Sequence, residues 1–185
     1  MHKTYPINIF KFCPHCAAAF DPQADNSFKC SGCGLHYYVN ANAAVCALIE
    51  DSEGRLLLTK RARDPMQGLL DLPGGFVDPL ESAEEALRRE IKEELDIELT
   101  EMHYMGSFPN RYVFSGLTYF TLDLAFVCAV KDLSILKPAD DVASILFLHP
   151  DRIDLNEIAF ESIRNIIAAY CQKIKTPTPL GFKGV

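Results

Sequence analysis

Three glutamates in one short stretch have the spacing of a metal site. Glu90, Glu93 and Glu94 stand at i, i+3 and i+4, so a helix would project all three from one side of the same turn. Like charges at this spacing destabilise an isolated helix by roughly a few tenths of a kcal/mol per pair. A hard divalent cation reverses that repulsion, and carboxylate oxygens suit magnesium or manganese. The alternative is a solvated acidic face, and the residues before the helix bear on that choice.

The surrounding sequence predicts a helix from Ser82 to about Leu95. Ser82 with Glu85 three residues later has the pattern of a capping box, which marks a helix start. Glu94 lies at the edge of an apolar stripe that recurs at helical spacing. The stripe consists of Ala83, Leu87, Ile91 and Leu95. Asp96 follows the helix, where a left-handed residue is common, and aspartate tolerates that conformation better than most residues.

A longer pattern extends from a glycine loop into this helix. It consists of Gly75, Glu81, Arg89, Glu90, Ile91, Glu93, Glu94, Asp96 and Ile97. Its spacing resembles the Nudix box: Gly, five residues, Glu, seven residues, Arg-Glu-aliphatic, one residue, Glu-Glu, one residue, Gly-aliphatic. Every fixed position agrees except the last glycine, which is Asp96 here. On this pattern the chain is identified as a member of the Nudix hydrolase superfamily.

The resemblance implies a fold, a reaction and a set of ligands. The fold is α/β (α+β), an α/β/α sandwich with a mixed sheet. The reaction is hydrolysis of a pyrophosphate bond in a nucleoside diphosphate linked to another moiety, which releases a nucleotide monophosphate. Mg²⁺ or Mn²⁺ would be held by the carboxylates of Glu90, Glu93 and Glu94 and by the carbonyl of Gly75, and resemblance to one branch of the family adds Asp141.

Within the same pattern, the glutamates and the arginine have different expected roles. Glu93 or Glu94 matches positions able to assist proton removal from the attacking water, and Glu90 completes the catalytic set. Glu81 and Arg89 are expected to be structural, pairing to fix the glycine loop against the helix.

Four cysteines near the N-terminus form two C-x-x-C pairs: Cys13, Cys16, Cys30 and Cys33. Four thiolates at this spacing fit a tetrahedral structural Zn²⁺, and a redox-active pair is the competing interpretation. A segment of this size cannot bury a sufficient core by itself, so metal binding would supply much of its stability. We therefore expect a zinc ribbon over residues 1–40, a Nudix hydrolase domain over 41–175, and a tail over 176–185.

Composition narrows the classes of protein. The 185 residues are 49% hydrophobic, and no apolar run is long enough to span a membrane. No secretory signal is visible, and the use of seven cysteines indicates a reducing compartment, so we expect a cytoplasmic protein. The net charge is −7, and residues 1–41 hold three lysines against two aspartates. This lacks the basic footprint of a dedicated nucleic-acid binder.

Alternating and continuous apolar runs predict the remaining elements. Strands are expected at 43–49, 55–60, 102–108, 117–130 and 143–148, and a closing helix at 156 to about 173. Residues 51–54 predict a turn, and residues 69–77 lead into the glycine loop.

A zinc ribbon ahead of a Nudix domain resembles the NADH pyrophosphatase branch. That resemblance implies that Tyr38 and Phe76 grip an adenine, whereas simple packing between domains is the alternative. The specificity signature of the branch is largely absent from residues 107–115, so another dinucleotide or a nucleotide sugar stays open as the substrate. Asn110, Arg111 and Tyr112 are the candidate substrate contacts there. A homodimer is implied by family analogy alone.

Two other classes of function stay open. One is a non-catalytic Nudix sensor that binds ADP-ribose-like ligands, which the intact box argues against. The other is a zinc-ribbon nucleic-acid-binding module, which the nearly neutral ribbon argues against, because phosphate contacts need lysine and arginine. RNA carrying an NAD cap also stays open as a substrate.

Overall fold

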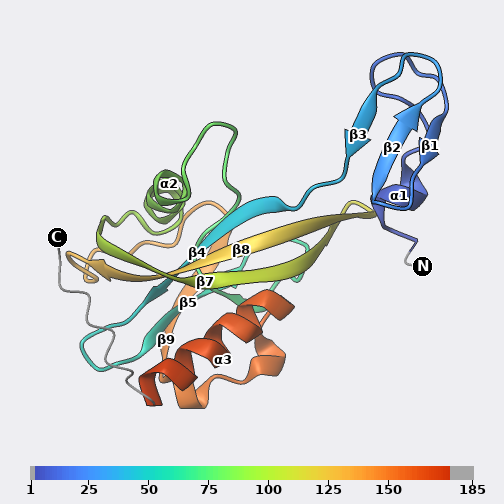
Figure 1. The fold of residues 1–185 in the computed structure, drawn as a ribbon. Coiled ribbons are helices and arrows are strands. Elements are labelled where there is room, and N and C mark those ends of the chain that lie inside the picture. Colours follow the sequence, from blue (N-terminus) through green and yellow to red (C-terminus); the bar gives the residue numbers. More distant parts are fainter. Residues whose placement is uncertain (1–2, 176–185) are drawn as a thin grey trace.

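A computed structural model describes residues 3–175 of the chain, and two three-stranded sheets form its main body. One has the order β4-β8-β7 and the other β6-β5-β9. The strands of the body are β4 (Asn42–Ile49), β5 (Leu56–Arg61), β6 (Leu70–Asp71), β7 (Leu99–Phe114), β8 (Leu117–Val130) and β9 (Val142–Leu148). Helices α2 (Ala83–Leu95) and α3 (Glu161–Lys175) lie on opposite sides of the strands (Figure 1).

Each helix covers its own hydrophobic core. The apolar stripe of α2 packs with Val45, Ile49 and Phe126 on one side of the body. On the other side, the apolar face of α3 packs with Leu48, Leu58 and neighbouring side chains. Strand β4 runs parallel to β8, whereas β7 and β8 are antiparallel, so this sheet is mixed. The expected α/β/α sandwich with a mixed sheet is confirmed.

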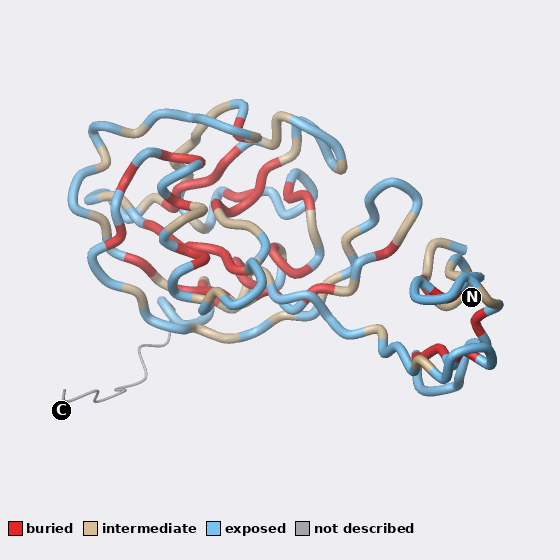
Figure 2. The backbone as a smooth tube through the Cα atoms, turned by 90° about the horizontal axis from the view of Figure 1, so that it is seen from above, coloured by how far each residue is buried: buried red, intermediate tan, exposed pale blue. Residues whose placement is uncertain are grey.

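The N-terminal residues form a separate small unit. Helix α1 (Pro6–Ile9) precedes a three-stranded antiparallel sheet of β1 (Phe20–Pro22), β2 (Ser27–Cys30) and β3 (His36–Tyr38). Figure 2 shows that buried residues concentrate in the main body, whereas the small unit contains few. Its core includes two of the zinc-ligand candidates, Cys13 and Cys30, beside Phe20 and Phe28.

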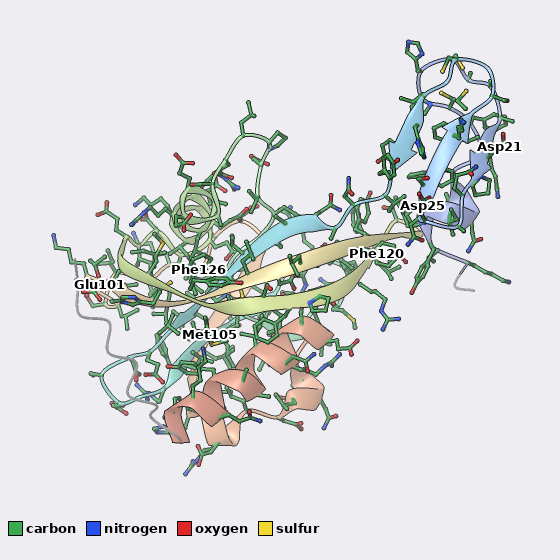
Figure 3. All side chains as sticks on the ribbon, in the orientation of Figure 1. Asp21, Asp25, Glu101, Met105, Phe120 and Phe126 are labelled. Carbon is green, nitrogen blue, oxygen red and sulfur yellow. The ribbon has the colours of Figure 1, made fainter. Side chains whose placement is uncertain are left out.

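A long hairpin carries the small unit. Strands β7 and β8 extend from the body as an arm that reaches α1 (Figure 1). The backbone N–H of Thr118 donates to the carbonyl of Thr4 at 2.8 Å. The rings of Tyr5 and Phe120 meet edge to face at 5.0 Å, and Phe120 lies near the end of the arm (Figure 3).

Two sequence-based boundaries were wrong. The closing helix begins at Glu161 and not at 156, because Asp154 caps a separate 3₁₀ turn, Leu155–Glu157. The backbone of the next residues then follows β6, since Ala159 N–H donates to Leu70 C=O at 2.8 Å. Strand β7 also continues six residues beyond the expected end at 108, because its cross-strand pairs with β8 persist to Phe114.

Other elements agree with the sequence. The strands expected at 43–49, 55–60, 117–130 and 143–148 are present within one residue, and the turn at 51–54 is confirmed. The predicted tail, 176–185, lies outside the described residues. None of the helices within residues 3–175 has the length and apolarity that a membrane crossing requires.

Candidate metal and nucleotide site

The acidic face of α2 lies against the glycine loop. Ser82 caps the helix with the reciprocal bonds of a capping box to Glu85, as expected. Glu94 is buried, and its Oε2 accepts a hydrogen bond from the backbone N–H of Gly74 at 2.9 Å. Gly74 has a φ of +140°, and a Cβ there would lie 2.1 Å from the carbonyl oxygen of Val45. Only glycine fits at this position, so the loop approaches β4 and α2 together.

Glu90 fills the space beside the second glycine. A Cβ added to Gly75 would lie 2.6 Å from the Glu90 carboxyl group, so the absent side chain makes room for this carboxylate. The carbonyl of Gly75, a predicted metal ligand, accepts from Val45 N–H at 2.8 Å. Because a carbonyl has two lone pairs, one stays available for an ion.

Arg89 ties the loop to the helix. Its guanidinium forms two hydrogen bonds with Glu81, at 3.0 and 2.9 Å, and a third with the Phe76 carbonyl at 3.0 Å. The same side chain lies 2.8 Å from Glu90 Oε1 and 3.2 Å from Glu93 Oε2. This geometry agrees with the structural role expected for Arg89 and Glu81. The positive charge of Arg89 also offsets part of the negative charge of Glu90 and Glu93.

Burial changes the pKa values of Glu90 and Glu94. Burial raises the pKa of Glu94 to about 9, and repulsion from Asp141 and Glu90 adds to the rise. Burial also raises the pKa of Glu90, against the stabilising charge of Arg89, with Glu93 and Asp141 adding repulsion. Without a cation, the surroundings of Glu90 and Glu94 therefore disfavour the ionised carboxylates, and a hard divalent cation would favour them.

Asp141 reaches this cluster from a loop far along the chain. The backbone N–H groups of Lys137 and Ala139 donate to the carbonyls of Leu95 and Glu94, at 3.3 and 3.0 Å. The loop before β9 is thus bound to the end of α2. Its position places Asp141 where its charge acts on both Glu90 and Glu94.

The predicted acidic ligands are near one another but not gathered at one point. Within residues 3–175, only the four cysteines form a group whose ligand atoms all lie within 4.8 Å of one another. Glu93 is half exposed and bonded to Arg89. The donor set of Glu90, Glu93, Glu94 and Asp141 fits magnesium or manganese in its chemistry, with oxygen ligands on one side of the glycine loop.

Two adjoining cavities form a cleft between this acidic cluster and an aromatic group. Arg61, Asp71, Gly74 and Asp141 line both its acidic end and the wider part beyond. In the wider part, the Tyr112 ring lies between Phe76 and Phe160, with centroid distances of 5.7 and 5.4 Å. The cleft therefore joins carboxylates suited to cations with rings suited to a nucleobase.

The structure separates the other predicted substrate contacts. Asn110 and Tyr112 line the cleft. Arg111, between them on β7, points to the opposite face, because side chains alternate along a strand. Its guanidinium lies 3.5 Å from the Tyr5 hydroxyl and 3.8 Å from Glu161. Tyr38 lies in the small unit, where it contacts His36, and it does not line the cleft with Phe76.

Four residues that sequence reasoning missed also line the cleft: Arg61, Asp71, Asp123 and Phe160. Asp71 forms a buried ion pair with Arg61 at 2.9 Å, and burial raises the pKa of Asp71 to about 6. Both aspartates interrupt apolar strand sequences, Leu-Asp-Leu in each case, and a charge in such a run is the signal that could have found them.

The four cysteines form the second candidate metal centre. The sulfur atoms of Cys13 and Cys33 are 3.7 Å apart, and those of Cys16 and Cys30 are 3.5 Å apart. A tetrahedral zinc ion with Zn–S bonds of about 2.3 Å requires sulfurs separated by about 3.8 Å. The backbone N–H of Cys33 lowers the pKa of Cys30, whereas side-chain contacts with Cys30 and Cys33 raise the pKa of Cys16.

A family model described as the NUDIX domain matches residues 40–170, more than half of the chain. The chain belongs to the Nudix family. The helix with the acidic face, the glycine loop and the sandwich around them are the parts that this Nudix match covers.

Curated relatives and solved structures agree with the Nudix assignment. The NAD-capped RNA hydrolase NudC of Chromobacterium violaceum is 34% identical over 98 residues, 52% of this chain and 36% of that protein. NudC of Vibrio atlanticus is 26% identical over 160 residues, 85% of this chain and 57% of that protein. A crystal structure of a Nudix hydrolase from Nitrosomonas europaea has a TM-score of 0.66 at 23% identity, covering 92% of this chain and 95% of that one. The chain thus spans only part of the NudC relatives, and the structural match shows the shared Nudix fold.

Proposed function

We propose that this Nudix protein hydrolyses the pyrophosphate bond of a nucleoside diphosphate linked to a second moiety, such as NADH, NAD or ADP-ribose. The product would be a nucleoside monophosphate. One observation carries the proposal: the cavity lined by the buried Glu94 adjoins the cavity lined by Phe76, Tyr112 and Phe160, because Gly74 and Asp141 line both. The names of the NudC relatives support the substrate class and add NAD-capped RNA as a further candidate.

The reaction requires charge neutralisation and positioning. Glu90, Glu93, Glu94 and Asp141, with the Gly75 carbonyl, would hold Mg²⁺ or Mn²⁺, which when bound neutralises a diphosphate and lowers the pKa of water. Arg89 and Glu81 keep the glycine loop against this face. Glu93 and Glu94 are the candidates for accepting a proton from the attacking water, and the aromatic rings position the nucleoside.

The cysteine cluster has a separate role in this proposal. We propose that residues 1–40 form a zinc ribbon, with Zn²⁺ on Cys13, Cys16, Cys30 and Cys33, and that 41–175 form the Nudix domain. The sulfur separations support the choice of zinc. The ribbon lies at the end of the arm, away from the acidic face (Figure 1), so its metal serves the fold of the small unit. The homodimer implied by resemblance stays a prediction.

A substrate panel with mass detection tests the proposal. NADH, NAD, ADP-ribose, diadenosine polyphosphates, nucleotide sugars and NAD-capped RNA are incubated with magnesium, and monophosphate release is measured. Glu93→Gln or Glu94→Gln should lower turnover at least about a hundredfold, as loss of a charge-stabilising group does. Glu84→Gln, an exposed carboxylate of the same helix, is the matched control. Binding of ADP-ribose without any monophosphate release would reject catalysis in favour of a sensor.

A further inference from the structure

One positive charge lies in an otherwise acidic cleft. Within residues 3–175, Arg61 is the only lysine, arginine or histidine that lines the two adjoining cavities, and it lines both of them. A diphosphate that enters the cleft is repelled by the carboxylates of the walls, so the position of this cation is important. These carboxylates are Asp71, Glu94, Asp123 and Asp141.

The guanidinium of Arg61 is held in place from several directions. Its Nε donates to the Pro65 carbonyl at 2.8 Å, and its Nη1 donates to Asp71 Oδ2 at 2.9 Å. Its central carbon lies 5.0 Å from the centre of the Phe160 ring. The side chain is 15% exposed. Because the guanidinium is already fixed, it loses little further freedom when it binds a ligand.

Arg61 keeps hydrogen-bonding capacity beyond these contacts. A guanidinium has five N–H groups, of which Pro65 and Asp71 each accept from one. Burial raises the pKa of Tyr112, and a hydrogen bond with Arg61 opposes that rise, so the Tyr112 hydroxyl is a further partner. The other N–H groups belong to a side chain that lines the cleft. A fork of N–H groups matches the oxygens of a phosphate.

The position of Arg61 selects one phosphate of the substrate. Arg61 shares one cavity with Glu94 of the acidic cluster, and in the other cavity it contacts Phe160 of the aromatic group. A substrate that has its nucleoside on the rings and its diphosphate at the acidic cluster has the nucleoside-linked phosphate between the two. We propose that Arg61 binds this nucleoside-linked phosphate. The identity of the ligand as a nucleotide rests on the proposed function.

A purely structural role of Arg61 is the competing explanation. The ion pair with Asp71 joins β5 to β6, and the bond to Pro65 closes the loop between these strands. The two explanations differ for Asp71→Asn, which weakens the ion pair but also removes a negative charge beside the phosphate. Phosphate binding predicts that AMP binds Asp71→Asn equally well or more tightly, whereas a structural role predicts that loss of either partner weakens AMP binding.

Calorimetric binding of AMP in magnesium to the full chain tests the proposal, because AMP contains no pyrophosphate bond to hydrolyse. Arg61→Met should weaken AMP binding at least about tenfold, the effect of losing a hydrogen bond to a charged group. Arg63→Met removes an exposed arginine two residues further along and is the matched control, with a change below about twofold. Full affinity in a folded Arg61→Met protein, a tenfold loss in Asp71→Asn, or no AMP binding by the unaltered chain at millimolar concentration would overturn the proposal.

A double variant removes the risk that Arg61→Met does not fold. Arg61→Met together with Asp71→Asn leaves no unpaired buried charge at this pair. It should bind AMP at least about tenfold more weakly than Asp71→Asn does. Adenosine, which lacks the phosphate, should bind both proteins within about threefold of each other. Equal losses for AMP and adenosine would show that Arg61 supports the aromatic group and does not bind the phosphate.

The same preparations distinguish this inference from the proposed function. Loss of AMP affinity in Arg61→Met, in a protein whose unaltered form does not hydrolyse ADP-ribose in magnesium, would leave the phosphate contact intact and refute the enzyme. Hydrolysis of ADP-ribose by the unaltered chain, with the same KM and the same AMP affinity in Arg61→Met, would leave the enzyme intact and refute the phosphate contact.

Discussion

The two candidate metal centres of this chain differ in how closely their ligand atoms are gathered. Four cysteine sulfurs already lie within 4.8 Å of one another, at separations that a tetrahedral ion requires. The carboxylates of the Nudix helix are held apart, with Glu94 on the Gly74 amide and Glu93 on Arg89. A closed set of ligands suits an ion that stabilises a fold, whereas an open set leaves room for substrate oxygens.

The difference follows from what surrounds each centre. The small unit has a core of a few apolar residues, so we expect its fold to depend on a bound metal ion. The acidic face of α2 belongs to a sandwich with two large hydrophobic cores. The stability of these cores allows the fold to tolerate the electrostatic repulsion between the clustered carboxylates. We infer that metal removal unfolds the first region, whereas in the second it leaves the fold and abolishes the chemistry.

Loss of the cysteine centre should have the largest effect. Cys30→Ser should release zinc and unfold residues 13–38, since structural zinc contributes about 10–16 kcal/mol in comparable peptides. Zinc content and amide hydrogen exchange measure this, and the strands of the main body should stay protected. Cys171→Ser, outside the cluster, is the control and should retain zinc. Full zinc occupancy in Cys30→Ser would contradict the assignment.

A methyl group at Gly74 tests how far the acidic site depends on its scaffold. Gly74→Ala places a Cβ 2.1 Å from the Val45 carbonyl, so we expect a loss of more than about 4 kcal/mol in the free energy of unfolding. Gly54→Ala shares a positive φ but has open space around the new carbon, so it should cost about 1 kcal/mol. Urea unfolding of both proteins measures the contrast, and equal losses would contradict it.

The stability of the protein without divalent cations should depend on pH through Glu94. Its pKa rises from 4.5 to about 9 on folding, so the folded state binds a proton that the unfolded state releases between those values. The free energy of unfolding should therefore fall as pH increases from about 5 to about 9. Glu94→Gln should flatten this dependence and be the more stable protein at high pH.

Urea unfolding at several pH values, with and without magnesium, checks this behaviour. Magnesium should restore stability at high pH in the original protein and have little effect on Glu94→Gln, because the ion binds the ionised carboxylate. An unchanged pH slope in the variant would show that another group titrates.

The smallest effect is expected at the one departure from the Nudix pattern. Asp96 has φ 56° and ψ 31°, the left-handed conformation that the family's glycine adopts readily. Asp96→Gly removes that strain but also loses the ion pair with Lys92, so the free energy of unfolding should change by less than about 1 kcal/mol. Asp96→Ala keeps the strain without the ion pair and should be the less stable of the two by thermal unfolding.

Structural features that depend on neighbouring residues could be predicted from the sequence. The capping box, the apolar stripe of α2 and the left-handed Asp96 were all readable, because each depends on residues a few positions apart. The paired cysteines were readable for the same reason, and their sulfurs do converge.

Structural features that depend on contacts between distant segments could not be predicted from the sequence. Ile158 and Ala159 leave the predicted closing helix because they pair with Leu70, almost ninety residues earlier. The surroundings of Asp123 on β8 come from segments far apart in the sequence: β7 pairs with its strand, and Ser162 of α3 donates a hydrogen bond to its carboxylate. The family resemblance places Tyr38 beside Phe76, but the β7–β8 arm holds the small unit away from the main body (Figure 1), and Tyr38 does not line the cleft.

A crystal soaked in manganese tests the central contrast most directly. Anomalous scattering should show a manganese ion in contact with the Glu90 and Glu94 carboxylates, while a zinc ion remains on the four cysteines. Under the same conditions, the protein should release AMP from ADP-ribose only when the divalent cation is present. An acidic turn of α2 without any ion at millimolar manganese, while the cysteines keep their zinc, would contradict a metal-binding role for these glutamates.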